Sequence, residues 1–405
     1  MIIPFSPPYN DADVENEVLD SLRSGWITTG PKVKALENEV CKYVGVEAAL
    51  GVNSATSAMM LVLHWYGITR GDEVIVPAYT YCATALAAMH IGAKVVMVDV
   101  GNDFNIDVDK IEAAITEKTK AIIPVDFAGW PCDYEAINRL VNKSSIKNKF
   151  ISKGIVQEKL GRILVMSDAA HSFGAVYKNK RVGVWADITV FSFHAVKNLT
   201  TAEGGAICLH LPKPFDNKEV YQTLRLWSLN GQTKDAFSKS KAGGWKYDIV
   251  YPGFKMNLPD VLAAIGLAQI KKYDEALLKQ RKRVFDFYSH SFEKLNWAWL
   301  PPYQKDGCSG SYHLYPLRVR NISEEQRDEI IEKITATGVA VNVHFIPMPM
   351  LSVFKNMGYQ INDYSVTYKN YAAEISLPIY PQLNNEACTY IVDQVIASVQ
   401  SVLSI

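Results

Sequence analysis

The sequence has no excess of charge of either sign and no long hydrophobic run. Its 42 Lys and Arg residues balance 42 Asp and Glu residues, so the formal net charge is zero at pH 7. No Lys/Arg block stands out, which argues against nucleic acid or a membrane surface as a partner. No apolar run reaches the roughly 18 residues of a membrane-spanning helix. The amino end lacks the basic region and apolar core of a signal peptide, so none is expected.

Cysteine is scarce, and its spacing excludes the common cysteine-based sites. The six cysteines lie far apart and none belongs to a C-x-x-C pair. This spacing predicts free, buried thiols in a reducing cytoplasm, and we expect no metal site. Internal repeats and low-complexity tracts are absent as well. The sequence is therefore typical of a cytoplasmic globular protein.

What the chain does contain is a regular alternation of short apolar runs and helical patterns. With 405 residues, 48% of them hydrophobic, it is long enough for two domains with a large core. The alternation predicts βα units and a largely parallel sheet, hence an α/β fold. The expected strands are residues 74–76, 95–98, 121–125, 163–166 and 188–193.

A long helical pattern follows this region. It begins at Leu258 and continues to about Arg283, long enough to bridge two lobes. Beyond it, a strand is expected at 312–319 and a helix at 324–337. We therefore expect a large domain over residues 1–270 and a smaller C-terminal α/β domain over residues 271–405. The Lys-, Ser- and Asn-bearing stretch 142–161 is interpreted as a surface excursion with no catalytic part.

Two polar residues stand at the ends of apolar runs. Lys197 follows the run 188–193, where a lysine amine can face a cavity and become nucleophilic through desolvation. The alternative for a single loop lysine is an ordinary surface position. Asp168 ends the run 163–166, where an acid can pair with a protonated ring nitrogen. Its alternative is to cap a helix.

A third element opens a helix with small hydroxyl residues, Asn53-Ser54-Ala55-Thr56-Ser57. Free backbone N–H groups and hydroxyls at a helix start attract phosphate, although N-capping explains one Ser or Thr equally well. A phosphate site, a strand-end aspartate and a strand-end lysine are the anchors that pyridoxal 5'-phosphate needs for its phosphate, ring nitrogen and aldehyde. The sequence therefore predicts this cofactor, bound by the large domain over residues 1–270.

With these residues, the chain resembles the nucleotide-sugar aminotransferases of the DegT/StrS type, which are fold type I pyridoxal-phosphate enzymes. The resemblance runs nearly end to end, through segments 24–31, 71–77, 118–125, 168–171, 191–206 and 376–378. It implies an aspartate-aminotransferase-like fold and a homodimer with shared active sites. It also implies amino transfer from glutamate to a nucleotide-linked keto-deoxysugar, 4-keto in preference to 3-keto, for cell-surface glycan or amino-sugar biosynthesis.

The resemblance also implies roles for individual residues. Lys197, Asp168 and His171 are the expected catalytic residues. The expected cofactor contacts are Ala55, Thr56, Tyr81, Asp168, His171, Ser192 and Lys197, with Lys255 or Asn257 reaching across a dimer interface. The expected substrate contacts are Trp26, Thr28, Thr29, His313 and His344. The alternatives are core packing for Tyr81, a bond to a backbone carbonyl for His171, a solvated side chain for Lys255 and helix capping for Asn257.

Two other functions fit parts of this pattern. In a pyridoxamine-dependent sugar dehydratase of the same scaffold, histidine replaces the lysine, so Lys197 argues against that reaction. A non-enzymatic cofactor-binding regulator would not need all three anchors. The chain also departs from the resemblance at Pro349, where relatives commonly have a second histidine, and this removes a donor from the expected sugar-nucleotide side. The choice between UDP, dTDP and GDP therefore stays open.

Overall fold

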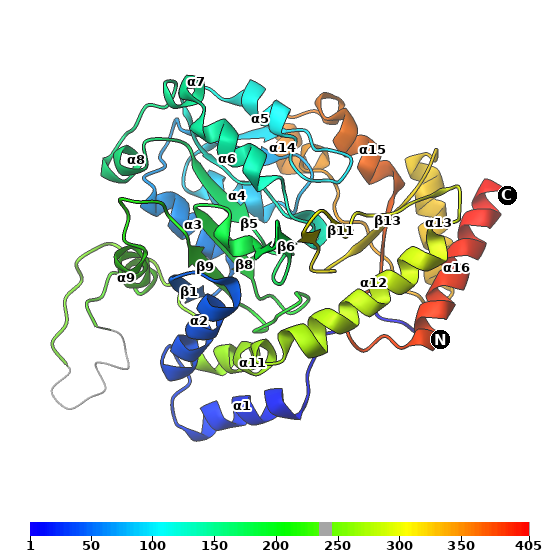
Figure 1. Ribbon diagram of the computed structural model, residues 1–405, viewed down its shortest axis with the longest axis horizontal. Helices are drawn as coiled ribbons and strands as arrows, with labels where there is room; N and C mark the ends of the chain where they lie inside the picture. The colour runs from blue at the N-terminus through cyan, green and yellow to red at the C-terminus, as the bar shows by residue number, and fades with distance from the viewer. Residues whose placement is uncertain (235–244, 405) are drawn as a thin grey trace.

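The computed structural model describes residues 1–234 and 245–404. Its centre is a seven-stranded mixed sheet in the order β1-β9-β8-β5-β4-β2-β3 (Figure 1). The strands are β1 (Ala48–Val52), β2 (Glu73–Pro77), β3 (Lys94–Val98), β4 (Thr119–Ile122), β5 (Leu164–Asp168), β8 (Ile188–Ser192) and β9 (Gly205–Leu209). Strand β9 is antiparallel to both neighbours, and the other pairings are parallel. The five strands and the largely parallel sheet expected from the sequence are confirmed.

Helices cover both faces of this sheet, which explains why its strands read as continuous apolar runs. One face packs against α3 (Ala55–Trp65), α4 (Ala83–His90) and α9 (Asn217–Ser228). The other packs against α2 (Pro31–Val44), α5 (Val108–Ala114), α6 (Tyr134–Asn142) and α11 (Asp260–Ile270). We call the sheet with these helices the large lobe.

A second, antiparallel sheet organises the C-terminal part of the chain. It contains β10 (Ala298–Trp299), β13 (Tyr315–Val319) and β14 (Glu374–Leu377), packed with α12 (Lys279–Phe292), α13 (Glu324–Ala336) and α16 (Asn385–Leu403). These elements, here called the small lobe, lie together in Figure 1 with both chain ends beside them. The expected strand and helix are confirmed, although the strand begins only at Tyr315.

The expected division at residue 270 stays a prediction, and two segments of the chain cross it. Ile3 pairs with Val339 and belongs to the core of the small lobe. In the opposite direction, Phe354 in α14 (Ser352–Asn356) packs into the core of the large lobe. Each lobe therefore recruits a segment from the far end of the chain.

The long helix expected between residues 258 and 283 is interrupted. Helix α11 ends at Ile270, and a π-helical segment, Tyr273–Leu278, then leads directly into α12. The buried Tyr273 hydroxyl donates a hydrogen bond to the carbonyl of Phe173, 2.6 Å away. This bond ties the irregular segment to the large lobe. The connection between the lobes is thus two helices joined by a π-helical turn.

A small sheet of two-residue strands also joins the lobes. Strand β12 (Cys308–Ser309) pairs with β6 (Val176–Tyr177) of the large lobe, and β11 (Gln304–Lys305) and β7 (Lys180–Arg181) complete the sheet. Next to it, the Ser311 amide donates to the carbonyl of Gly129, 3.0 Å away. A Cβ at Gly129 would lie 2.0 Å from the Ser311 hydroxyl oxygen, so this close approach requires glycine.

Residues 142–161, expected to be a surface excursion, form two short helices, α7 (Ser144–Lys147) and α8 (Ile155–Leu160). The buried Gln157 amide in α8 donates to the carbonyls of Tyr66 and Gly67, at 3.1 and 3.3 Å. The excursion is therefore fastened to the large lobe just after α3.

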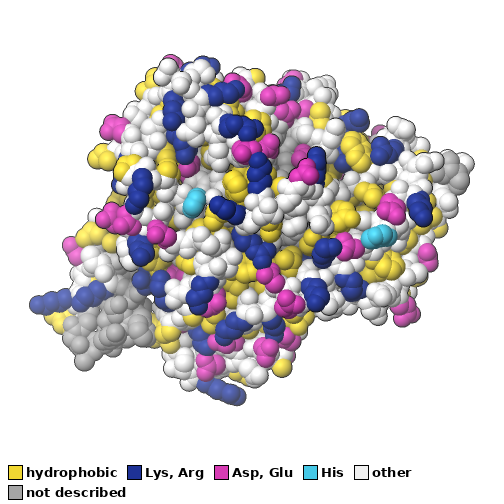
Figure 2. Space-filling view, viewed as in Figure 1, with side chains coloured by type: hydrophobic (Ala, Val, Ile, Leu, Met, Phe, Trp, Pro, Cys, Tyr) yellow, Lys and Arg dark blue, Asp and Glu magenta, His cyan; other side chains and the backbone are white. Residues whose placement is uncertain are grey.

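The other described helices are α1 (Ala12–Arg23) and α15 (Ser365–Ala373). Among all helices in the described ranges, none is both long and apolar enough to span a bilayer. On the face shown in Figure 2, acidic and basic side chains are interspersed over the surface.

Helix α2 depends on a cap from another helix. Its N-cap residue is Gly30, which has no side chain to accept the first amide groups. Instead, the buried carboxylate of Asp260 accepts from the amides of Gly30 (2.8 Å), Lys32 (3.1 Å) and Val33 (2.9 Å). One acid thus holds the start of α2 against α11.

We expect Asp260→Ala to lower the free energy of unfolding by about 2–3 kcal/mol, because it leaves buried amide donors without an acceptor. Thermal unfolding followed by circular dichroism measures this loss as a lower Tm. Asp393→Ala, at an exposed position of α16, is the matched control and should leave Tm unchanged. Equal Tm values for the two variants would contradict the capping role.

Candidate active site

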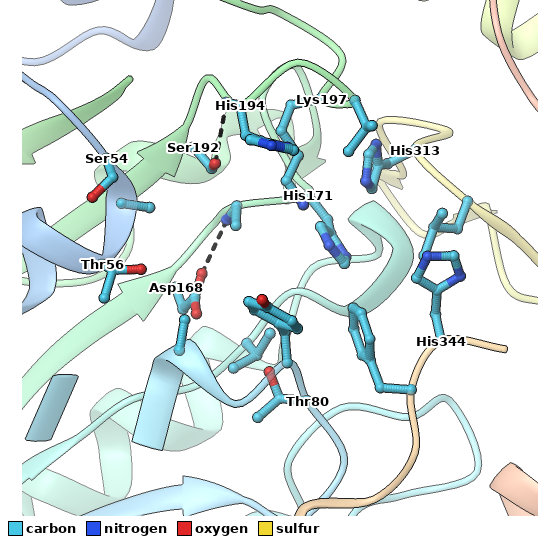
Figure 3. A pocket seen from close by; sticks show the side chains of 18 of the residues that line it. Ser54, Thr56, Thr80, Asp168, His171, Ser192, His194, Lys197, His313 and His344 are labelled. Atoms are coloured by element: carbon cyan, nitrogen blue, oxygen red, sulfur yellow. Dashed lines mark hydrogen bonds between the residues drawn. The ribbon is translucent and has the colours of Figure 1, made fainter. Parts of the chain in front are cut away.

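A cavity of about 370 Å³ opens where the carboxyl ends of β5 and β8 meet the start of α3. Residues from both lobes line it, and Figure 3 shows ten of them labelled. Ligands of open α/β sheets bind at this edge, and a cavity of this size suits a small cofactor or substrate.

Lys197 lies in the loop after β8, and its side chain extends into the cavity towards His171 (Figure 3). A turn in which the Lys197 amide donates to the carbonyl of His194 (2.9 Å) fixes the loop. Burial lowers the pKa of Lys197 to about 8, and the negative charge of Asp168 opposes this shift only in part. An appreciable share of the amine is therefore neutral near pH 7 and able to act as a nucleophile.

Asp168 is the last residue of β5, and both of its carboxylate oxygens are engaged. The hydroxyl of Thr84 donates to Oδ2 (2.8 Å), and the amide of Ala170 donates to Oδ1 (3.2 Å). Burial raises the pKa of Asp168, while these bonds and the charge of Lys197 act in the opposite direction. A cationic group placed in the cavity would therefore favour the ionised acid. The Ala170 bond closes a turn and not a helix, so the capping alternative is wrong.

The start of α3 offers free amide groups to the cavity. Ser54 is the N-cap, and its hydroxyl oxygen accepts from the amide of Ser57 (3.1 Å). Within the described chain, the amides of Ala55 and Thr56 have no hydrogen-bond acceptor. A Cβ at Gly205 would lie 2.8 Å from the Ala55 nitrogen, so glycine there keeps the strand close to these donors. Such a helix start binds an anionic group.

Two histidines form one wall of the cavity, with ring centroids 4.3 Å apart. Burial lowers the pKa of both His171 and His313 well below the usual value, so both rings are neutral. Asn198 donates to the carbonyl of Ser311 (2.7 Å), which turns its amide oxygen towards Nδ1 of His313, 2.9 Å away. Nδ1 of His313 therefore carries the proton.

His171 is buried, and its Nδ1 has no hydrogen-bond partner in the described part of the chain. The expected alternative, a ring satisfied by a backbone carbonyl, is therefore wrong. This atom is itself closed off from the cavity, although other atoms of His171 line it beside His313. The predicted contact of His171 with a ring hydroxyl stays a prediction.

Aromatic rings border the mouth of the cavity. Tyr81 is 60% exposed, so the alternative of core packing is wrong, and the buried tyrosine of this segment is Tyr79. The Tyr81 ring lies 5.7 Å from that of Phe345. On the small-lobe side, Phe5 stacks on His344 with a centroid distance of 5.3 Å and an interplanar angle of 24°.

The structure brings together most of the predicted site residues: Ala55, Thr56, Tyr81, Asp168, His171, Ser192, Lys197, His313 and His344. The other predicted residues do not line this cavity in their own chain: Trp26, Thr28, Thr29, Lys255 and Asn257. Pro349, where the chain departs from its relatives, is buried in a 3₁₀ turn away from the cavity lining.

Asn257 supports the loop before α2. Its amide donates to the Thr29 hydroxyl (2.7 Å), which in turn donates to the carbonyl of Leu258 (2.6 Å). The N-cap of α11 is Pro259, without a side-chain cap, so the capping alternative for Asn257 is wrong. Lys255 is exposed beside it. The predicted contact across a dimer interface stays a prediction for both residues.

Sequence reasoning missed several residues of the site. Thr84 could have been found from the sequence, because it is a hydroxyl residue only three positions after Tyr81, at the start of α4. Asn198 is harder to identify from the sequence, because only its position next to Lys197 suggests a role. Nothing in the sequence points to Phe5, because only the pairing of Ile3 with the small lobe brings it to the cavity. Within the described ranges, no cluster of His, Cys, Asp and Glu could hold a metal ion.

The chain belongs to the DegT/DnrJ/EryC1/StrS aminotransferase family, which it matches over residues 8–150 and 155–396. The unmatched residues 151–154 lie inside the excursion 142–161. The match confirms the family predicted from the sequence.

Individual relatives agree over nearly the whole chain. The Bacillus subtilis spore coat polysaccharide biosynthesis protein SpsC is 35% identical, with 99% of this chain and 97% of that protein covered. The Campylobacter jejuni UDP-4-amino-4,6-dideoxy-N-acetyl-beta-L-altrosamine transaminase is 32% identical, with 97% and 98% covered. The structure of a putative sugar aminotransferase, Spr1654 from Streptococcus pneumoniae, in its PMP form superimposes with a TM-score of 0.94 at 41% identity, covering 100% and 99%. The predicted fold class is therefore confirmed.

We expect the amine of Lys197 in the cofactor-free protein to titrate near pH 8 and not at the ordinary value of 10.5. Reductive methylation with ¹³C-formaldehyde, followed by ¹³C NMR across a pH series, measures this titration, and Lys197→Ala identifies the signal. In Asp168→Asn the midpoint should fall further, because the carboxylate that favours the charged amine is gone. A Lys197 signal that titrates with the bulk of the lysines would contradict the desolvated amine.

Proposed function

We propose that this enzyme transfers an amino group from glutamate to a nucleotide-linked 4-keto-deoxysugar, with pyridoxal 5'-phosphate as its cofactor. The observation that carries the proposal is the convergence of Lys197, Asp168 and the free amides of α3 on one cavity. The confirmed family supports it, as does the Streptococcus pneumoniae relative, whose structures include PMP and PLP forms.

The residues of the cavity fit this cofactor. The amides of Ala55 and Thr56, with the hydroxyl of Ser192, would hold its phosphate, and Asp168 would hold its ring nitrogen. His171, which lines the cavity beside His313, would contact the ring hydroxyl. Tyr81, exposed at the mouth, would cover the ring face. When bound, pyridoxal phosphate supplies an electron sink for the removal of a proton from the α-carbon of an amino donor.

Lys197 has two tasks in this proposal. Its amine would hold the aldehyde of the cofactor, and as a free base it would take up and return the proton of the donor's α-carbon. A pKa near 8 suits both, since a base works best when its pKa lies near the working pH. Asp168 would keep a ring nitrogen protonated, because the buried carboxylate would gain a nearby opposite charge when that proton is present.

His313, His344 and Phe5 line the small-lobe side of the cavity, where we place the acceptor sugar. The Campylobacter jejuni relative is named as a transaminase of a 4-amino-4,6-dideoxy sugar linked to UDP, which supports amination at C4. SpsC is named for polysaccharide biosynthesis, which supports a product destined for a cell-surface glycan. Lys197 also favours amino transfer over the dehydratase reaction, which by the same resemblance needs histidine at this position.

The predicted residues outside the cavity find a role in a homodimer with shared sites. Lys255 and Asn257 would complete the phosphate site of the partner subunit, and the turn 26–29 would reach the partner's substrate. The link between Asn257 and Thr29 supports this proposal, because it holds both segments as one unit. A two-fold axis gives each chain the same contact.

Lys197→Ala should lower kcat by several orders of magnitude while the fold survives, because the covalent anchor and the proton carrier are lost together. Two measurements test this: covalent trapping of the cofactor by borohydride, and the visible absorption change on addition of glutamate. Lys279→Ala, on the exposed start of α12, is the matched control and should behave like the wild type. Covalent trapping at normal yield in Lys197→Ala would exclude this residue as the anchor.

A mixing experiment tests the shared site. A Lys197→Ala chain is combined with a chain carrying Lys255→Ala and Asn257→Ala, each nearly inactive alone. Random exchange makes half of the dimers mixed with one intact site each, so about a quarter of wild-type activity should return. The matched control mixes Lys197→Ala with Asp168→Asn, both within one chain's site, and should recover none. Absence of recovery in the first mixture, despite exchange, would place Lys255 and Asn257 in their own subunit's site.

A further inference from the structure

His344 is fastened to the edge strand of the small-lobe sheet. Asn342 and Ser376 pair in antiparallel fashion, with amide-to-carbonyl distances of 3.2 and 2.8 Å. This register places His344 opposite Glu374. Glu374 and Ser376 stand two positions apart on β14, so their side chains share one face of the strand. The histidine at the cavity and two buried polar groups are thus aligned by backbone pairing.

A chain of hydrogen bonds connects these three side chains. Nδ1 of His344 lies 3.0 Å from the hydroxyl oxygen of Ser376, and that hydroxyl bonds Oε1 of Glu374. The other carboxylate oxygen, Oε2, accepts the backbone amide of His344 at 3.0 Å. Both carboxylate oxygens of Glu374 are therefore linked to His344, Oε1 through Ser376 and Oε2 directly. Nε2 of His344 has no hydrogen-bond partner in the described chain, and the residue lines the cavity.

The direction of these hydrogen bonds depends on whether Glu374 is protonated. When Glu374 is ionised it only accepts, so the Ser376 hydroxyl donates to it and His344 must donate from Nδ1. When Glu374 is protonated, its O–H donates to Ser376, and Ser376 donates to Nδ1 of His344. The ring proton then lies on Nε2. His313 has no such freedom, because the Asn198 amide that faces it is oriented by the carbonyl of Ser311.

We propose that Glu374 and Ser376 are positioning residues that set the tautomer of His344. With Glu374 ionised, Nε2 of His344 faces the substrate as a hydrogen-bond acceptor for a sugar hydroxyl; with Glu374 protonated, Nε2 is a donor. The role of His344 towards a sugar rests on the proposed function, whereas the coupling between Glu374 and the ring does not.

The residues around Glu374 set the pKa of its carboxyl within a range that is accessible to experiment. Burial raises the pKa of Glu374 to about 8, and the bonds from Ser376 and His344 oppose this only in part. Arg318 on β13 and Arg327 on α13 face the acid and also favour its charged form, while the buried hydroxyl of Tyr79 lies across from it. His344 itself stays neutral, because burial and the charge of Lys197 lower its pKa to about 3. The tautomer can therefore change while the imidazole charge does not.

Solid-state ¹⁵N NMR of histidine-labelled, cofactor-free protein tests this coupling, because a bare ring nitrogen and a protonated one give distinct shifts. The chain has eight histidines, and a difference spectrum against His344→Gln identifies the signals of His344. We expect the proton on Nε2 at pH 6.5 and on Nδ1 at pH 9.5, about 1.5 units either side of the pKa. The same tautomer at both pH values in the wild type would overturn the proposal.

Two variants separate the coupling from simple loss of structure. Glu374→Gln keeps the acceptor for the His344 amide but always donates to Ser376, so the proton should remain on Nε2 at both pH values. Ser376→Ala should abolish the tautomer change, because it removes the hydroxyl that links Glu374 to His344. Ser289→Ala, which removes another buried hydrogen-bonded hydroxyl of the small lobe, is the matched control and should keep it. A wild-type tautomer change in Glu374→Gln or Ser376→Ala would overturn the assignment. No substrate is used, so the outcome of this experiment does not depend on whether the proposed function is correct.

Discussion

The parallel pairing of β5 with β8 is the interaction on which the geometry of the site depends, because it makes both strands end at the same edge of the sheet. Asp168 pairs with Val190, so the acid and the loop carrying Lys197 leave the sheet side by side. Antiparallel β9 then starts at that edge with Gly205, next to the first amides of α3. Three groups from distant parts of the chain therefore hold their relative positions through the main chain of one rigid sheet, before any ligand arrives.

Removal of water determines the protonation of the groups at this edge. Burial lowers the pKa of Lys197 and raises that of Asp168, so both move towards their neutral forms. The histidines of the cavity are neutral for the same reason. Groups in this state exchange protons with a substrate at small cost in free energy. A bound molecule that brings a phosphate and a basic ring nitrogen would favour the charged forms of Lys197 and Asp168.

The sequence predicts those parts of the structure that depend on local pattern. Apolar runs predict the strands, and residues at their ends, such as Lys197 and Asp168, predict where the site lies. The interruption after α11 was missed, because the apolar spacing of a helix continues across residues 271–278. The cap that Asp260 provides for α2 and the stacking of Phe5 on His344 were missed too. Both join residues more than two hundred positions apart, and no local pattern reports such contacts.

The small sheet in which β12 pairs with β6 limits how far the two lobes can move when a ligand binds. It ties residues 308–313, including His313, to the large lobe through backbone bonds on the side of the cavity opposite α3. Hinge closure of one lobe onto the other would have to break these bonds. Rigid-backbone docking is thus a reasonable first approximation for virtual screening here, with rotamer freedom given to the exposed Tyr81 at the entrance.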